Sequence, residues 1–277
     1  MKILITGGAG FIGSHLCRAL LDRGEAVLCL DNLQTARPSN LPGLQADPNF
    51  TFVRCDIANP LPAEVLALAP RIHRIYNLAC AASPPLYQRD PEHTMLTNVV
   101  GTNHLLRLAE SARARFLLTS TSEVYGDPMV HPQPETYRGS VNPVGPRACY
   151  DEGKRAAEAL TFDYGRAGRA QVRVARIFNT SGPNMDPDDG RVVSNLIVAR
   201  STGMNGMPAN MMTTIATHTR FSMRIDDSTP LLPSSAPSLR ALSHSWITMA
   251  TNGSANTPLA TRMLQMPLLT TQATRVR

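Results

Sequence analysis

Tyr150 and Lys154 stand four residues apart in the run ACYDEGKRAAEAL, so their side chains share one face if this run is helical. Thr121 comes 29 residues before Tyr150, at the end of the apolar run FLLTST. A tyrosine hydroxyl has a pKa of about 10, and a neighbouring ammonium would lower that pKa toward neutrality. Tyr150 could then take a proton from a substrate hydroxyl while Thr121 hydrogen-bonds the same oxygen. The spacing predicts a proton-transfer site; the alternative interpretation is a solvated Tyr–Lys pair on an amphipathic helix.

A glycine-rich loop near the N-terminus is typical of a dinucleotide site. Gly7, Gly10 and Gly13 have the spacing GxxGxxG between a run that predicts a strand and one that predicts a helix. The first glycine would permit the tight turn, the second a close approach of the pyrophosphate, and the third close packing of helix on strand. The helix N-terminus would offer its N–H groups and dipole to the phosphates. We therefore predict dinucleotide binding, with Phe11 and Ile12 at the end of the loop.

Two carboxylates end the next two predicted strands. Asp31 follows Gly13 by 18 residues, where a carboxylate accepts hydrogen bonds from the adenosine ribose and repels a 2′-phosphate. This position favours NAD over NADP. Asp56 ends the third predicted strand, from which it could reach the adenine amino group. The alternative interpretation of each aspartate is a capping or turn residue.

Short apolar runs alternate with helical ones as far as about residue 200, which predicts an α/β fold with a doubly wound parallel sheet. Helices should cover both faces of this sheet, and the crossovers should be right-handed. The predicted strands are 2–6, 26–31, 50–56, 72–79, 116–121 and 172–178, and the predicted helices lie near 11–23, 62–69, 92–114 and 149–167.

The last part of the chain has a different composition. Residues 201–277 hold 8 of the 12 Met and 13 Thr, lack Lys, Glu and Tyr, and follow no strand or helix period. We predict a Rossmann NAD-binding domain that carries the catalytic residues over 1–179. Residues 180–277 would form a small, incomplete C-terminal substrate lobe. Within it, 201–277 is expected to be atypical, either disordered or the product of a frameshift.

Composition argues against several classes of protein. The 277 residues are 43% hydrophobic, enough for a substantial core, and no apolar run predicts a membrane span. The net charge is +6, without a basic block or basic helix face, so nucleic acid binding is not expected. The five cysteines are scattered and the seven histidines form no HExxH, so we expect buried cysteines and no metal site. We expect a cytoplasmic protein without a signal peptide or a membrane partner.

These features occur in longer runs that resemble one enzyme family. ILITGGAGFIGSHLC, IYNLACAASPPLYQRDP, STSEVYGDPMVHPQPETY and VNPVGPRACYDEGKRAAE resemble the extended short-chain dehydrogenase/reductases that act on nucleotide sugars. Within this NAD-dependent epimerase/dehydratase family they look most like the UDP-glucuronate decarboxylases, also called UDP-xylose synthases. The resemblance covers residues 2–198. Related sugar 4,6-dehydratases carry Asp-Glu after the Thr, whereas this chain has Ser122-Glu123.

The resemblance implies an NAD-dependent carboxy-lyase with a UDP-sugar substrate. Oxidation of C4 of the glucuronosyl ring would place the C6 carboxylate β to a ketone, from which CO2 leaves readily. Reduction of C4 would then give UDP-xylose and regenerate NAD. A homodimer formed through the helices near 92–114 and 149–167 is also implied. The alternatives are another nucleotide-sugar 4-epimerase or 4,6-dehydratase, and a catalytically dead NAD-binding protein.

The resemblance also implies roles for individual residues. The catalytic set would be Thr121, Ser122, Glu123, Tyr150 and Lys154. The substrate would contact Tyr87, Asn179 and Arg191. The NAD site would comprise Gly7, Gly10, Phe11, Ile12, Gly13, Asp31, Asn32, Asp56, Ile57, Leu78, Cys80, Thr97, Tyr150 and Lys154.

Overall fold

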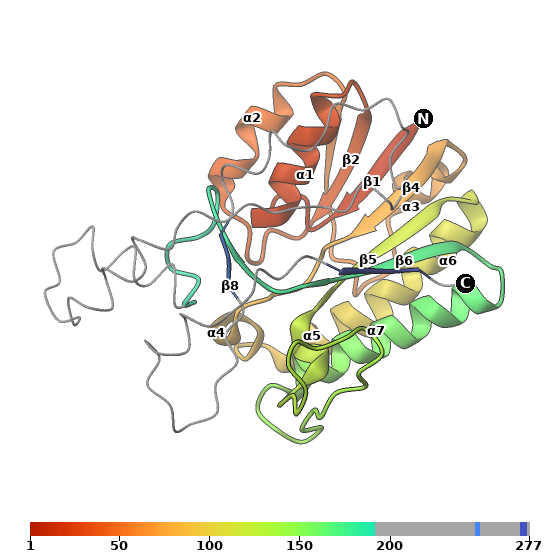
Figure 1. Cartoon of the computed structure of the whole chain (residues 1–277). Coiled ribbons are helices and arrows are strands. Elements are labelled where there is room, and N and C mark those ends of the chain that lie inside the picture. Colours follow the sequence, from red (N-terminus) through yellow and green to blue (C-terminus); the bar gives the residue numbers. More distant parts are fainter. Residues whose placement is uncertain (192–246, 250–271, 276–277) are drawn as a thin grey trace, which may run out of the picture.

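A seven-stranded sheet forms the centre of the computed structural model, which describes residues 1–191, 247–249 and 272–275 (Figure 1). The strand order is β3-β2-β1-β4-β5-β6-β9. Strands β1 to β6 are parallel, which confirms the predicted doubly wound sheet, and β9 runs antiparallel to β6. Outside this sheet, β7 pairs with β8. The strands are β1 Lys2–Thr6, β2 Ala26–Asp31, β3 Phe50–Arg54, β4 Ile72–Asn77, β5 Arg115–Thr121, β6 Gln171–Ile177, β7 Asn179–Ser181, β8 Ile247–Met249 and β9 Gln272–Arg275.

Helices cover both faces of the parallel strands (Figure 1). They are α1 Phe11–Leu21, α2 Pro42–Gln45, α3 Ala63–Ala67, α4 Pro84–Tyr87, α5 Pro91–Leu96, α6 Thr102–Ala112 and α7 Ala148–Arg166, with 3₁₀ turns at η1 Pro38–Asn40, η2 Ala69–Arg71 and η4 Ser122–Tyr125. Ile3 and Ile5 of β1 pack in the core beneath α1 and α2. Leu4, between them, packs in the opposite core with residues of α6 and α7. Alternate side chains of one strand thus serve two apolar layers, as in buried parallel sheets.

The helix predicted near 92–114 is three segments in the structure. α5 begins after Asp90, whose carboxylate caps it by accepting a backbone N–H of the first turn at 3.0 Å. A π-helical segment, η3 Thr97–Gly101, follows, and α6 is capped at its C-terminus by Arg113, which has the left-handed conformation with φ 51°. Single π turns inside α-helices occur often at functional sites. The π segment here turns Thr97 into the protein, where it is buried.

Strands β2 and β3 lie on one side of β1, and β4 to β6 lie on the other, so the strand order reverses between β1 and β4. In α/β sheets, ligands bind at such a point, beyond the carboxyl ends of the strands. A buried polar chain links those ends. The Thr6 hydroxyl donates to Asn77 Oδ1 at 2.8 Å, and the Asn77 amide donates to Thr102 Oγ1 at 3.1 Å. The Thr119 hydroxyl donates to the Asn77 carbonyl at 2.9 Å. These satisfied bonds fix the ends of β1, β4 and β5 relative to one another, and the site is built on this edge.

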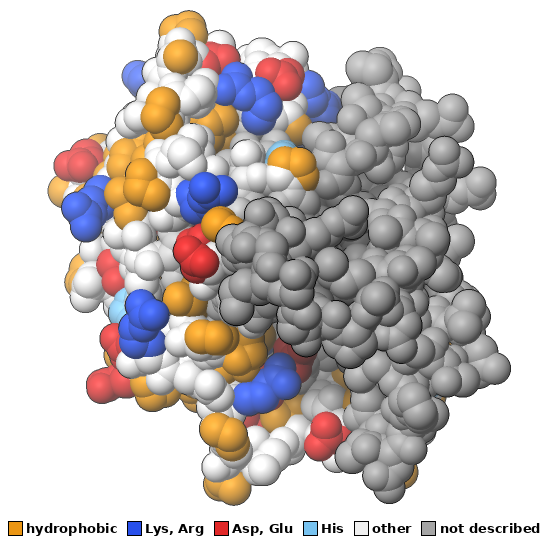
Figure 2. Space-filling model, turned by 90° about the vertical axis from the view of Figure 1, so that its left-hand side faces the viewer, with side chains coloured by type: hydrophobic (Ala, Val, Ile, Leu, Met, Phe, Trp, Pro, Cys, Tyr) orange, Lys and Arg blue, Asp and Glu red, His pale blue; other side chains and the backbone are white. Residues whose placement is uncertain are grey.

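The predicted domain organisation is only partly within the described residues. The predicted Rossmann domain 1–179 is fully described, whereas most of the predicted lobe 180–277 lies outside; of the atypical stretch 201–277, only β8 and β9 are described. In the part of the chain that the structure describes, no helix is both long and apolar enough to cross a membrane. Figure 2 shows cationic and anionic side chains interspersed over the described part of one face, rather than gathered in one basic area.

Candidate active site

The glycine-rich loop is shaped by close approaches that exclude side chains. Gly7 has a positive φ of 69°, and a Cβ there would lie 2.8 Å from the backbone of Leu78. A Cβ at Gly13 would lie 2.0 Å from the carbonyl oxygen of Gly7. The Gly10 N–H donates to that same oxygen at 3.2 Å and closes the turn. Only glycine at the first and third positions lets α1 pack against the loop.

The loop leaves room for a dinucleotide. Among the described residues, a Cβ at Gly10 would meet only the Gly7 carbonyl oxygen, at 3.2 Å. Thr97 is 6% exposed, and its Oγ1 has no hydrogen-bond partner among the described residues. A buried hydroxyl is costly unless a ligand or water satisfies it. The open cradle at the N-terminus of α1 and this hydroxyl both fit the dinucleotide that the loop predicts.

Asp31 is buried at the end of β2 and anchors the glycine loop. Its Oδ2 accepts the Ala9 N–H at 3.0 Å, and its Oδ1 accepts the Leu33 N–H at 2.8 Å. Burial raises the pKa of Asp31, and the backbone N–H groups oppose that rise. A carboxylate oxygen has two lone pairs, so Oδ1 can also accept from a ribose hydroxyl.

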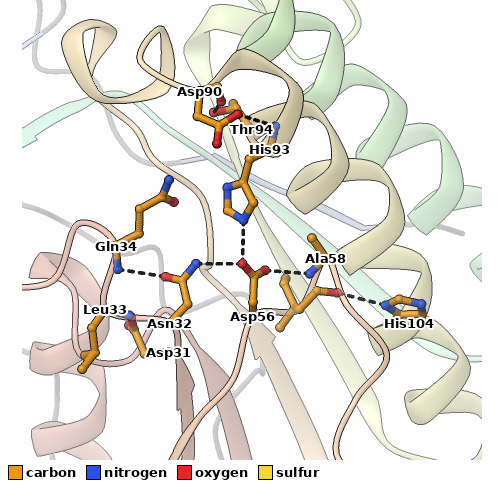
Figure 3. A network of polar contacts seen from close by, with 11 residues as sticks. Asp31, Asn32, Leu33, Gln34, Asp56, Ala58, Asp90, His93, Thr94 and His104 are labelled. Atoms are coloured by element: carbon orange, nitrogen blue, oxygen red, sulfur yellow. Dashed lines mark hydrogen bonds and ion pairs between the residues drawn. The ribbon is translucent and has the colours of Figure 1, made fainter.

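Asp56 lies two residues beyond β3 and is held from three directions (Figure 3). Its Oδ2 accepts from the Asn32 amide at 3.1 Å and from the His93 imidazole at 2.6 Å, and its Oδ1 accepts the Ala58 N–H at 2.9 Å. Burial alone would raise the pKa of Asp56, but these hydrogen bonds outweigh burial and lower it. The carboxyl group is therefore ionised near neutral pH and can only accept hydrogen bonds.

Tyr150 and Lys154 lie on the buried face of α7, where they are 6% and 4% exposed. Burial raises the pKa of the Tyr150 hydroxyl, and a hydrogen bond with Thr121 opposes the rise. Burial lowers the pKa of Lys154, whose ammonium donates to the Thr119 carbonyl at 3.0 Å and lies 5.9 Å from the Tyr150 ring centroid. Burial is the largest cause of the shift at Tyr150, so in the chain by itself the Tyr150 pKa is raised.

A tyrosine pair and an ion pair form the wall beside Tyr150. The Tyr87 ring is 1% exposed and stacks on the Tyr150 ring, with centroids 4.9 Å apart and planes 5° apart. Arg147 donates from Nε to the Tyr87 hydroxyl at 3.0 Å and pairs through Nη2 with the Glu123 carboxylate. Thr121 Oγ1 accepts the Glu123 N–H at 3.2 Å. These contacts gather Thr121, Glu123 and Tyr150 at the carboxyl end of β5.

The other predicted cofactor residues are held in different ways. Cys80 Sγ lies 3.2 Å from the Asn98 amide nitrogen, which donates to it. Ile57 is 2% exposed and belongs to the core beneath α6, so its side chain is not available to a ligand. Phe11 and Ile12 are half-buried in the first turn of α1.

The predicted substrate residues and Ser122 lie at the margin of the centre. Ser122 is the half-buried first residue of η4, directly after Thr121. Asn179 begins β7 and is exposed. Arg191 donates from its backbone N–H and its Nε to the Asp189 carboxylate, and its charge opposes the rise in the Tyr150 pKa. Of the residues predicted for the diphosphate, Arg191 therefore lies within electrostatic reach of Tyr150.

Two residues of the centre, Arg147 and Asp151, are not among those predicted from the sequence. Arg147 precedes Tyr150 by three residues at the start of α7, and this helical spacing was a usable signal. Asp151 is 8% exposed, and its Oδ1 is buried without a hydrogen-bond partner in the described part of the chain. Burial raises the pKa of Asp151 to about 6, and Arg147 opposes that rise. Only the tertiary structure reveals this carboxyl group, since no spacing distinguishes it.

Comparison with known proteins yields matches over most of the chain. Residues 3–214 match the profile of the "NAD dependent epimerase/dehydratase family". The chain is 54% identical over 197 residues to UDP-glucuronic acid decarboxylase 2 of Arabidopsis thaliana, a match that covers 71% of this chain and 43% of the relative. The chain spans about half the length of the curated relatives it matches.

Solved structures with a similar fold are also found. UDP-glucose 4-epimerase of Thermotoga maritima, solved with UDP-glucose, matches with a TM-score of 0.63 and 28% identity, over 73% of this chain and 64% of that one. UDP-glucose 4-epimerase of Thermus thermophilus, solved with NAD, matches with a TM-score of 0.61 and 28% identity, over 75% of this chain and 64% of that one.

Proposed function

The chain belongs to the NAD dependent epimerase/dehydratase family, and from this premise we propose that it converts UDP-glucuronate to UDP-xylose and CO2 with NAD as cofactor. One observation carries the proposal. Thr121, Glu123 and Tyr150 meet at the carboxyl end of β5, with Arg147 holding the Glu123 carboxylate. The similarity to UDP-glucuronic acid decarboxylases identifies the substrate class for which this arrangement is proposed.

In this proposal NAD lies across the carboxyl ends of β1, β2 and β4. The glycine loop would hold the pyrophosphate, Asp31 the adenosine ribose, and Asp56 the adenine. The Thr97 hydroxyl, which no described residue hydrogen-bonds, and the Cys80 thiol would line the nicotinamide half. When bound, NAD supplies the hydride acceptor for C4 of the sugar and a positive ring that favours ionised Tyr150.

Proton transfer at C4 falls to Tyr150 in this mechanism. In its ionised form the Tyr150 oxygen would take the proton of the C4 hydroxyl as C4 is oxidised to a ketone, while Thr121 hydrogen-bonds the same substrate oxygen. Lys154 stabilises the ionised tyrosine electrostatically. Arg147 keeps Glu123 in place, so that Ser122 and Glu123 can orient the sugar ring.

Decarboxylation needs little further catalysis once the ketone exists. The C6 carboxylate is β to the C4 carbonyl, so the C5–C6 bond breaks, CO2 leaves and the electron pair passes to the C4 oxygen as an enolate. A proton adds to C5 and restores the ketone. Reduction of C4 and return of the proton from Tyr150 then complete UDP-xylose.

Substrate contacts, assembly and location belong to the same proposal. Asn179 and Arg191 would contact the UDP diphosphate, for which a guanidinium is well suited. Tyr87, whose hydroxyl accepts a hydrogen bond from Arg147, would face the sugar. We propose a homodimer, to be tested by sedimentation velocity. A cytoplasmic location is supported by the cysteines, all of which are unpaired in the structure.

The proposed activity is tested by incubating the purified chain with NAD and UDP-glucuronate and following UDP-xylose and CO2 by mass spectrometry. Tyr150→Phe should lower the rate by about 10²–10⁴-fold and leave NAD affinity close to that of the parent chain. Interconversion of neutral UDP-sugars, without CO2, would support an epimerase or dehydratase instead. NAD binding by calorimetry with no turnover of any nucleotide sugar would identify an inactive NAD-binding protein.

A further inference from the structure

Three elements far apart in the chain converge on the Asp56 carboxylate (Figure 3). Asn32 reaches it from the end of β2, Ala58 from the loop that follows β3, and His93 from α5. The His93 contact joins residues 37 positions apart, with Nε2 2.6 Å from Oδ2. Since a carboxylate only accepts, Nε2 of His93 carries the proton that it donates.

The two oxygens of Asp56 are not equivalent. Oδ2 accepts from both Asn32 and His93, which occupies its two lone pairs. Oδ1 accepts the Ala58 N–H at 2.9 Å and has a second lone pair. The Asp56 side chain is 24% exposed, so the carboxylate is accessible at one edge. Oδ1 is therefore the oxygen that can accept from a ligand.

His93 is itself rigidly placed. It lies in the first turn of α5, and its backbone N–H donates to the N-cap Asp90 at 3.0 Å. Its side chain is 23% exposed and bridges from the helix to the strand end. Removal of its donor would leave Asp56 with the Asn32 amide and the Ala58 N–H as its donors, and so weaken the constraint on rotation about its Cβ–Cγ bond.

We propose that His93 is a positioning residue that aims Oδ1 of Asp56 at the exocyclic amino group of adenine, and so sets selectivity for the base of the dinucleotide. The inference rests on the proposed use of NAD and adds a residue outside the predicted cofactor site. An ionised acceptor favours a 6-amino group, which donates, and repels a 6-oxo group, which does not. The strength of this discrimination depends on the orientation of the carboxylate, because hydrogen bonds weaken steeply as their angle departs from linearity.

The test compares the affinity for NAD with that for nicotinamide hypoxanthine dinucleotide, in which a 6-oxo group replaces the amino group. Isothermal calorimetry on the full chain gives both dissociation constants for each variant. The parent chain should prefer NAD by about tenfold or more, as expected for a hydrogen bond to a charged group. Asp56→Asn should abolish this preference, because an amide can donate to the 6-oxo group as well as accept.

His93→Leu should reduce the preference to about twofold, whereas His93→Gln, which keeps a donor, should restore part of it. His104→Gln is the matched control. His104 lies beside the same loop, but its Nδ1 donates to the Ile57 carbonyl at 2.9 Å rather than to Asp56. This control should keep the parent preference. A ratio of affinities measured on one sample does not depend on its folded fraction, so loss of stability alone cannot imitate the result.

Two results would overturn the proposal: a parent chain with equal affinity for the two dinucleotides, or a His93→Leu variant with the parent ratio. Failure of the proposed function would look different. In that case UDP-glucuronate would not be consumed, while the affinity ratios would still follow the identity of residue 93.

Discussion

At the scale of single residues, burial decides which charges the centre can carry. Tyr150 and Lys154 both shift toward their neutral forms, because desolvation penalises the ion in each case. Glu123 has Arg147 as a partner for its charge. Asp151 lies beside them without a hydrogen bond to Oδ1 from any described residue, so its ionised form has little stabilisation. The folded chain therefore carries an energetic cost at Asp151 that depends on pH.

Asp151→Asn should raise the free energy of unfolding at neutral pH by about 2 kcal/mol. The folded-state pKa of about 6 lies above the ordinary aspartate value, so folding retains a proton that the unfolded chain releases. Stability from this source is full below about pH 4 and is lost as the pH rises through about 6. The gain from the amide should therefore be absent near pH 4 and complete near pH 7.

Urea unfolding across roughly pH 4 to 8 measures this difference. Glu152→Gln serves as the control, because Glu152 forms a partly exposed pair with Arg155 at 3.5 Å. Such a pair contributes about 0–1 kcal/mol, so this variant should follow the parent chain. A constant difference between Asp151→Asn and the parent at every pH would contradict the assignment.

At the scale of elements, the starts of three helices position the residues of the candidate site. α1 begins at the glycine loop, η4 begins directly after Thr121, and α7 begins at Ala148, two residues before Tyr150. Each start therefore lies at the carboxyl edge of the sheet, where N–H groups of a first turn face a ligand. Within the glycine loop, Gly13 allows α1 to pack against the loop, and Gly10 leaves room for a ligand. Substitutions at these two positions can separate the two roles.

Gly10→Ala should mainly weaken NAD binding, whereas Gly13→Ala should mainly lower the stability of the fold. Gly10 has φ −72°, which any residue adopts, and within the described part of the chain a Cβ there would meet only one carbonyl oxygen, at 3.2 Å. Gly10→Ala should change stability by less than about 1 kcal/mol but weaken NAD binding by about tenfold or more, since the methyl group fills the open cradle. Gly13→Ala places a methyl group 2.0 Å from the Gly7 oxygen and should cost about 3 kcal/mol.

Urea unfolding and calorimetric titration with NAD distinguish the two variants. The interpretation fails if Gly10→Ala binds NAD as the parent chain does, or if Gly13→Ala keeps the parent stability.

At the scale of the whole molecule, a buried ion pair ties α7 to the sheet. Arg176 of β6 donates to both oxygens of Glu158 on α7, at 2.9 and 2.7 Å, and the pair is 16% and 9% exposed. The same guanidinium donates to the Tyr125 hydroxyl at 2.9 Å and the Glu135 carbonyl at 3.2 Å. One side chain therefore joins β6, α7, η4 and the loop that precedes α7.

Arg176→Met should destabilise the fold by about 3–5 kcal/mol, because it leaves the Glu158 carboxylate buried without its partner. The double variant Arg176→Met, Glu158→Leu should recover most of this loss, since an apolar pair has no charge to desolvate. Denaturant unfolding of the parent, both single variants and the double variant gives the coupling free energy. Additive effects of the two single changes would show that the pair does not act as a unit.

Much of this architecture is carried by residues close together in the chain. The glycine spacing, the strand and helix periods, and the Tyr150–Lys154 spacing each depend on fewer than twenty consecutive residues. Local sterics and side-chain periodicity act over the same distance, which is why the doubly wound sheet and the nucleotide loop were predictable. The helix predicted near 92–114 is present, but the pattern did not predict the π-helical segment Thr97–Gly101 within it.

The sequence by itself determined the parallel α/β fold and the position of the glycine-rich loop, and it predicted which residues could transfer a proton. Only the tertiary structure decided how those residues are charged and held. Arg147 meets Glu123 across 24 positions and Tyr87 across 60, and His93 meets Asp56 across 37. No periodic pattern relates residues so far apart, and burial, which shifts the pKa values of Tyr150 and Lys154, exists only after the layers have packed.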